Sequence, residues 1–197
     1  MSRQRLQSGI SLIETLVGMA IVIVALAMGL PSFSTYMQNT QIRNAAESIQ
    51  NGLSMARAEA ARRNTVVQFV LGSGSSWTVG CATVDGTNCP ASIQARSSSE
   101  GSSNATVTTS QVVTSTGTAA ATAAFTTTLS FNGFGKASTL PPGNSALFDI
   151  SNTSGGGSCA AAGGTMRCLR VVVTAGGQIR MCDPKLTLTN AGNPQAC

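Results

Sequence analysis

The side chains that could do covalent or metal chemistry are cysteines, carboxylates and serines, because the sequence contains no histidine. All six cysteines lie in the C-terminal two thirds of the chain, at Cys81, Cys89, Cys159, Cys168, Cys182 and Cys197. No two of them have the C-x-x-C spacing of a zinc knuckle or a thioredoxin-like redox pair, and no histidine is present to complete a metal shell. We therefore expect neither a metal nor a cofactor.

The carboxylates of the C-terminal region are scattered and mostly beside turn residues, at Asp85, Glu100, Asp149 and Asp183. The serines lie in Gly/Ser-rich runs that need no chemistry to explain them. Because a catalytic site needs a nucleophile or a general base with a partner, this pattern predicts that the protein is not an enzyme. The formal net charge of +5 does not require a nucleic-acid partner.

An even number of cysteines in a Gly/Ser-rich domain indicates disulfides formed in an oxidising compartment such as the bacterial periplasm. Many connectivities are possible, and free buried cysteines are the alternative. We expect the local set, which closes short loops: Cys81–Cys89, Cys159–Cys168 and Cys182–Cys197.

The N-terminal region has the pattern of a membrane anchor. Residues 10–30 form an apolar run broken by one charge, Glu14, and follow a basic leader, residues 1–9. As a helix rising about 1.5 Å per residue, the run would span roughly 30 Å, the thickness of a bilayer core. It is too long for an ordinary secretory signal. Because the leader arginines stay cytoplasmic, we expect a single pass with the C-terminal domain in the periplasm.

A carboxylate inside a membrane helix costs about 2.5–3.5 kcal/mol on insertion scales, so it usually marks a function. If Glu14 has no function in assembly, it lies near the membrane interface and reaches the lipid headgroups. If it has a function, the chain is cut between Gly9 and Ile10, which creates an amino group at Ile10. The amine of an incoming subunit could then neutralise Glu14 of its neighbour.

The segment GISLIETLV resembles the class III signal of type IV pilins and of type II secretion pseudopilins. The resemblance implies that a prepilin peptidase cuts after Gly9 and N-methylates Ile10. It also implies that the precursor is held in the inner membrane. Pro31 stands where many members carry a helix-kinking proline.

Residues 31–63 continue as an amphipathic helix. One apolar stripe follows the 3–4 spacing of a helix face, at Ile42, Ala46, Ile49, Leu53, Ala56 and Ala60. We expect this stripe to be the seam on which the head packs, with Gly52 softening the helix. The pair Arg62 and Arg63 followed by Asn64 predicts its end, because cations suit a helix C-terminus and asparagine tolerates the left-handed conformation.

Residues 64–197 have strand and turn patterns, so they predict a β-rich, disulfide-bonded head. The predicted fold is α+β: a long N-terminal helix, half transmembrane and half amphipathic, packed on a small antiparallel head. We expect two small sheets, one of them on the helix. The segment SMARAEAARRNTVVQF and the following strands, Thr65–Leu71 and Ser75–Gly80 with Trp77, resemble the GspH/FimT/FimU branch of the pilin-like family.

The last two strands permit a prediction of register. A turn at Ala175–Gly177 would place Val173 opposite Ile179 and Val171 opposite Met181, facing inward. Four residues would then face out: Arg170, Val172, Arg180 and Cys182.

The segment GQIRMCDP stands where relatives often carry a GRxR motif, which in FimT members is linked to DNA uptake. Gln178 replaces the first arginine and Arg180 is kept. Together with Arg167, Arg170 and Lys185 it could form a weak phosphate-binding patch. The alternative is that these are solvated surface charges, and no aromatic residues are interleaved for base stacking.

The CDP…AC ending, with Cys182 and Cys197 bracketing the tail, resembles FimU-like minor pilins. The resemblance implies a subunit that helps to prime or cap a type IV pilus, with other minor pilins and the major pilin as partners. A GspH-like pseudopilin of type II secretion and a FimT-like DNA receptor remain the alternatives.

Overall fold

In a computed structural model of the protein, the described residues are 11–86, 88–113, 121–152, 157–190 and 192–197. The chain forms two compact units, of which the first ends at Tyr36 and the second runs from Met37 to Cys197. The helix α1 (Leu12–Arg63) contributes to both units. It continues through Pro31 without a break in its helical assignment.

The amphipathic stripe of α1 is the part of the helix that packs on the head. All six residues of the predicted stripe, from Ile42 to Ala60, are fully buried, whereas Arg43, Glu47 and Arg57 are exposed. The helix ends where the sequence predicts. Asn64 has φ of 48°, and Thr65 N–H donates to the carbonyl of Ala60 at 3.2 Å, which closes the last turn.

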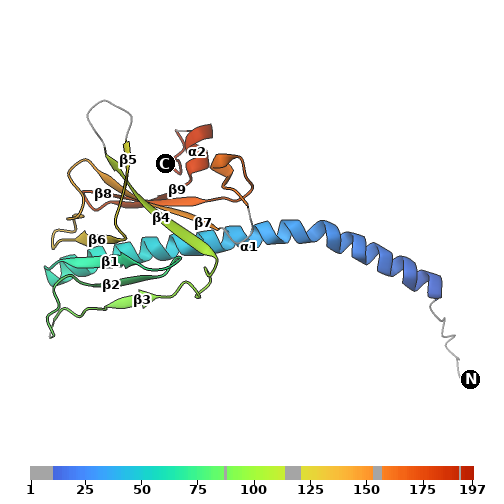
Figure 1. Ribbon diagram of the computed structural model, residues 1–197, viewed down its shortest axis with the longest axis horizontal. Coiled ribbons are helices and arrows are strands. Elements are labelled where there is room, and N and C mark those ends of the chain that lie inside the picture. Colours follow the sequence, from blue (N-terminus) through green and yellow to red (C-terminus); the bar gives the residue numbers. More distant parts are fainter. Residues whose placement is uncertain (1–10, 87, 114–120, 153–156, 191) are drawn as a thin grey trace, which may run out of the picture. The chain divides into compact units, whose positions relative to one another are not determined.

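The strands form two antiparallel sheets (Figure 1). The four-stranded sheet has the order β3-β2-β1-β6. Its strands are β1 (Val67–Leu71), β2 (Trp77–Cys81), β3 (Gln94–Arg96) and β6 (Thr128–Phe131). The five-stranded sheet has the order β5-β4-β7-β8-β9. Its strands are β4 (Ala105–Val113), β5 (Ala121–Ala124), β7 (Ser145–Asn152), β8 (Leu169–Thr174) and β9 (Ile179–Cys182). The α+β class is therefore confirmed.

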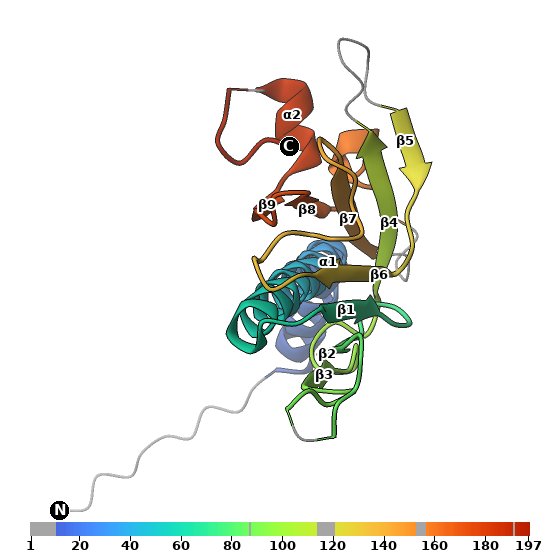
Figure 2. The same ribbon diagram turned by 90° about the vertical axis from the view of Figure 1, so that its left-hand side faces the viewer.

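Both sheets, rather than one, share a single core with the helix. Buried residues of α1, β1, β2, β6, β7 and β8 belong to the same apolar cluster. Phe69 of β1 and Phe148 of β7 meet edge to face, with ring centroids 5.9 Å apart, so the two sheets touch directly. Figure 2 shows strands of both sheets on one side of the helical segment that they cover. The expectation of one sheet on the helix is wrong because the inner faces of both sheets are apolar.

Gly52 has a packing role that the sequence analysis missed. A Cβ placed on it would lie 2.9 Å from a ring carbon of Phe69 and 2.9 Å from one of Trp77. The absence of a side chain therefore lets α1 approach the four-stranded sheet closely. At this contact the buried indole N–H of Trp77 donates to Ser48 Oγ at 2.7 Å, so the large aromatic side chain has its polar atom satisfied.

The predicted register of the last two strands is observed. Val173 pairs with Ile179 and Val171 pairs with Met181. Val171 and Val173 are buried in the core. Val172 and Cys182 lie on the opposite face, as expected, but they are also buried, with exposures of 8% and 3%. The C-terminal tail covers this face, because Leu147, Val172 and Cys182 form a second small cluster with Cys197 packed against it.

Four short elements were not predicted. Two are the strands β3 and β5, each at a sheet edge. The other two are the 3-10 helix η1 (Ala160–Ala162) and the helix α2 (Pro184–Thr189). The start of α2 carries a recognisable signal, since Asp183 caps the Lys185 N–H and Pro184 occupies the first turn. Its six residues are too few to show an apolar period.

Candidate functional site

The candidate assembly segment is the first unit, of which the described part begins at residue 11. The predicted cleavage pair, Gly9 and Ile10, lies outside the described residues. Glu14 is in the first turn of α1, where its N–H donates to the carbonyl of Ser11 at 3.0 Å. Pro31 lies within α1.

Apolar side chains are exposed on all sides of this part of α1. Ten of the large ones between residues 12 and 26 are more than half exposed: Leu12, Ile13, Leu16, Val17, Met19, Ile21, Val22, Ile23, Val24 and Leu26. A helix that is apolar all round requires apolar surroundings. Among the described residues, no helix satisfies the length and hydropathy required of a membrane span.

Three amide side chains of α1 attach the helix to the head at the beginning of the second unit. Asn39 Oδ1 accepts from the Arg167 N–H at 2.8 Å, and Gln41 Oε1 accepts from Asn152 Nδ2 at 3.2 Å. Asn44 Nδ2 donates to the Gly101 carbonyl at 3.2 Å. We name these three residues the amide clamp. Sequence reasoning missed them, although polar residues flanking an apolar helix stripe are a usable signal.

The six cysteines form the local disulfides expected from the sequence. The Cα–Cα distances are 5.6 Å for Cys81–Cys89, 5.4 Å for Cys159–Cys168 and 5.1 Å for Cys182–Cys197. The last bond closes the C-terminal clasp, residues 182–197, which contains α2. Within the clasp, Cys197 N–H donates to Thr187 Oγ1 at 2.7 Å and Asp183 N–H donates to the Gln195 carbonyl at 2.8 Å.

Three of the four cations predicted as a weak DNA patch have partners inside the head. Arg167 pairs with the buried Asp183 at 2.8 Å, and Arg170 pairs with Asp149 at 2.7 Å and 3.0 Å. Arg180 donates to the carbonyls of Ala196 and Cys197, at 3.2 Å and 3.1 Å. Lys185 is exposed on α2, with no side-chain partner among the described residues. These arginines thus hold strands and tail together.

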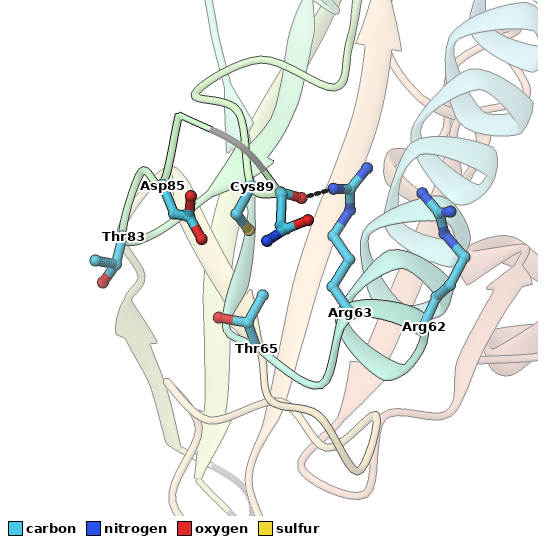
Figure 3. Close-up of a pocket in the computed structure, with 7 residues that line it drawn as sticks. Arg62, Arg63, Thr65, Thr83, Asp85 and Cys89 are labelled. Carbon is cyan, nitrogen blue, oxygen red and sulfur yellow. Dashed lines mark hydrogen bonds between the residues drawn. The ribbon is translucent and has the colours of Figure 1, made fainter.

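An open pocket of about 540 Å³ lies between the end of α1 and the loop that Cys81–Cys89 closes (Figure 3). Arg63 donates to the Asn88 carbonyl across it. Arg62 and Arg63 both bind Glu59, at 2.7 Å each. The hydrogen bond from Arg62 is the main cause of a lowered Glu59 pKa, to which Arg63 adds. The two arginines share the single charge of Glu59, and Arg63 in addition binds the Asn88 carbonyl. The described residues that line the pocket include no histidine and no free cysteine.

Comparison with known proteins identifies a matching family and two similar crystal structures. Residues 45–177 match the model of a protein family described as type II transport protein GspH. Two crystal forms of the Pseudomonas aeruginosa type IV minor pilin FimU are similar to this chain, with 15% and 14% identity and TM-scores of 0.45 and 0.44. Each match covers 71% of this chain, and 87% and 90% of the FimU chains. Among curated protein sequences, none matches significantly.

Proposed function

The chain belongs to the GspH family of type II transport proteins, and we propose that it is a FimU-like minor pilin, a structural subunit that helps to prime or cap a type IV pilus. The family supports the coarser statement that it is a minor pilin or pseudopilin that assembles with other pilin-like subunits. The structural observation that supports this coarser statement is the division of α1. One part exposes apolar side chains all round, and the other part is packed into the head.

The proposed life cycle begins with a precursor in the inner membrane. Prepilin peptidase cuts between Gly9 and Ile10 and N-methylates Ile10, and residues 10–30 remain the single membrane anchor. During assembly the helix leaves the lipid and exchanges lipid contacts for contacts with neighbouring helices, which keeps its apolar surface away from water. Glu14 then sets the register by pairing with the amine of an adjacent subunit.

In this proposal α1 anchors and assembles the subunit, and the head selects the neighbouring subunits. The amide clamp and the buried stripe of α1 fix the head on its helix. The C-terminal clasp supports the pilus assignment, because a disulfide-bracketed tail is the feature by which the sequence resembles FimU-like proteins.

A second candidate is a GspH-like pseudopilin of type II secretion, which the name of the matching family favours. A clean deletion of the gene in the native organism distinguishes the two. Loss of sheared surface pili with normal secretion supports the minor pilin. Normal pili with failed secretion supports the pseudopilin. If both are normal and DNA uptake is lost, the chain is instead a FimT-like receptor.

Processing is tested in the same strain. Replacing Gly9 with a bulky residue should leave the precursor uncut, which intact-mass measurement detects as a chain that keeps residues 1–9. Removal of the leader from that variant would contradict the proposed cleavage site.

A further inference from the structure

Phe134 is the most exposed large apolar side chain among the described residues, with 87% of its surface accessible. In the described part of residues 37–197 it is also the one exposed aromatic side chain. Other phenylalanines of the head, such as Phe69, Phe131 and Phe148, are fully buried. An exposed aromatic ring leaves a large apolar surface in contact with water, which is unfavourable. The exposed position of Phe134 therefore suggests that another molecule covers the ring.

The turn that carries Phe134 is held by its own hydrogen bonds. Asn132 Oδ1 accepts from the N–H groups of Phe134 and Lys136, both at 3.1 Å. Asn132 N–H donates to the Lys136 carbonyl at 3.0 Å, and Gly135 takes the positive φ of 72° that the turn requires. The ring is therefore presented on a preorganised turn, which reduces the entropy lost when a partner binds.

The turn rests on α1 beside a cation. A Cβ placed on Gly135 would lie 3.1 Å from Arg57 Nε, so the guanidinium lies against the turn. Arg57 and Lys136 are exposed, and neither side chain has a hydrogen bond or ion pair with any described residue. We name these three residues, Arg57, Phe134 and Lys136, the Phe134 patch.

The described carboxylates of the head all have partners of their own. Five are bound by arginines: Glu47, Glu59, Glu100, Asp149 and Asp183. Asp85 also has an interaction. In the described head of a second copy, each of these carboxylates would have to leave its present partner to bind Arg57 or Lys136. Charge complementarity points to a different protein, one with acidic residues around an apolar pocket.

Single-stranded nucleic acid fits this patch less well. Such ligands are bound by successive aromatic platforms along a groove that contacts many phosphates. The patch has one aromatic ring and two cations. A single rigid aromatic anchor with flanking charges is instead typical of a protein-binding hot spot.

We propose that the Phe134 patch docks the head onto a different pilin-type subunit, whose apolar pocket receives Phe134 and whose carboxylates meet Arg57 and Lys136. This inference rests on the proposed function, since it names the head contact by which the subunit would choose its neighbour.

Photo-crosslinking in the native organism tests the contact. The photoreactive residue p-benzoylphenylalanine replaces Phe134 in the full-length chain, and a matched control carries it at Val84, which is 58% exposed on another loop. Irradiation should link the variant at 134, but not the control at 84, to another pilin-like subunit identified by mass spectrometry. A link to a second copy of this chain, a nuclease-sensitive adduct or no link at 134 would each overturn the proposal.

Charge reversal supplies a second test that does not depend on the ring. Lys136→Glu should lower the amount of this chain in sheared filaments by about tenfold, the effect of losing one hot-spot interaction. Lys185→Glu is the matched control, because Lys185 is the other exposed lysine with no side-chain partner among the described residues. Equal incorporation of both variants would contradict the docking role of Lys136.

The two proposals fail in different ways. If the unaltered chain is missing from purified filaments, the proposed function fails. If the unaltered chain is present but Phe134→Ala is incorporated as well as the unaltered chain, the patch inference fails and the proposed function stands.

Discussion

Glu14 is the single charged side chain between Arg5 and Arg43. In an apolar helix surrounded by lipid or by other helices, an unpaired carboxylate is unfavourable by about 2.5–3.5 kcal/mol. A neighbouring subunit with a free terminal amine would remove this cost in one register and in no other. Under the proposed function, Glu14 therefore contributes specificity of assembly more than stability of the chain.

Glu14→Val should leave the protein in the membrane fraction and lower its amount in sheared filaments by at least about tenfold, because the charge pair that sets register offsets about 2.5–3.5 kcal/mol and each 1.4 kcal/mol is about a factor of ten. Quantitative immunoblots of both fractions measure this. Thr15→Val is the matched control, since among the described residues the Thr15 hydroxyl donates to the Leu12 carbonyl of its own helix, at 2.8 Å, and to no other group. Normal incorporation of Glu14→Val would remove the register role.

Glu59 has a pH-dependent role at the end of α1. Its pKa is lowered, first by the hydrogen bond from Arg62, so the folded state favours the carboxylate. A lowered folded pKa contributes stability that is present above the ordinary value of 4.5 and is lost as the pH falls through the folded pKa.

Glu59→Gln should therefore lower the free energy of unfolding at pH 7 by about 0.5 kcal/mol, the size usual for exposed ion pairs. The difference from the unaltered chain should shrink as the pH is lowered below 4.5. Urea unfolding of the detergent-solubilised protein at several pH values measures both effects. A difference that stays constant with pH would show that the carboxylate charge is not responsible.

At the scale of elements, α1 is joined to the four-stranded sheet at a close contact. Gly52 faces Phe69 and Trp77, whose exposures are 0% and 4%, so neither ring has free space to move into. Intrinsic helix propensity opposes glycine at this position, and packing requires it. Adding one methyl group to Gly52 shows which of the two effects is larger.

Gly52→Ala should destabilise the head, because overpacking costs about 1–3 kcal/mol and exceeds the gain of about 1 kcal/mol in helix propensity. Denaturant unfolding followed by Trp77 fluorescence measures the change. Ser54→Ala is the control, since Ser54 is exposed on the same helix. If Gly52→Ala were more stable than the unaltered chain, the close contact would not constrain α1.

At the scale of the whole head, the C-terminal clasp covers the second apolar cluster. Cys182 and Cys197 are 15 residues apart, and Cys197 packs on the cluster that contains Leu147 and Val172. Figures 1 and 2 show α2 next to β9 on the side away from α1. The clasp thus completes the outer layer of the five-stranded sheet.

Replacing both Cys182 and Cys197 with serine should lower the free energy of unfolding by about 3 kcal/mol, the value for a loop of this length. The released tail should become a site of limited proteolysis, which mass spectrometry of the fragments detects. The double variant Cys81→Ser/Cys89→Ser is the comparison and should leave the C-terminal tail protected. A tail that stays protected without Cys182–Cys197 would show that the hydrogen bonds of the clasp suffice.

The sequence by itself determined the features that depend on neighbouring residues. The stripe from Ile42 to Ala60 follows helical spacing, and Asn64 ends the helix by adopting a conformation that few residues tolerate. The facing of β8 and β9 follows from alternation and a short turn. The short loops between cysteines favour the local disulfide set that the structure contains. Each is a local pattern, so the linear order of residues contains the information.

Only the tertiary structure decided what depends on distant partners. From the sequence, Arg170 and Arg180 are expected to be surface cations. In the folded chain, Asp149 of β7 pairs with Arg170, and the C-terminal tail accepts hydrogen bonds from Arg180. Gly52 is a weak helix residue until two aromatic rings pack against it. Phe134 resembles any core phenylalanine in sequence and is placed in water by its turn. The physical reason is common to all of them: burial and charge pairing are properties of segments that meet only when the chain folds.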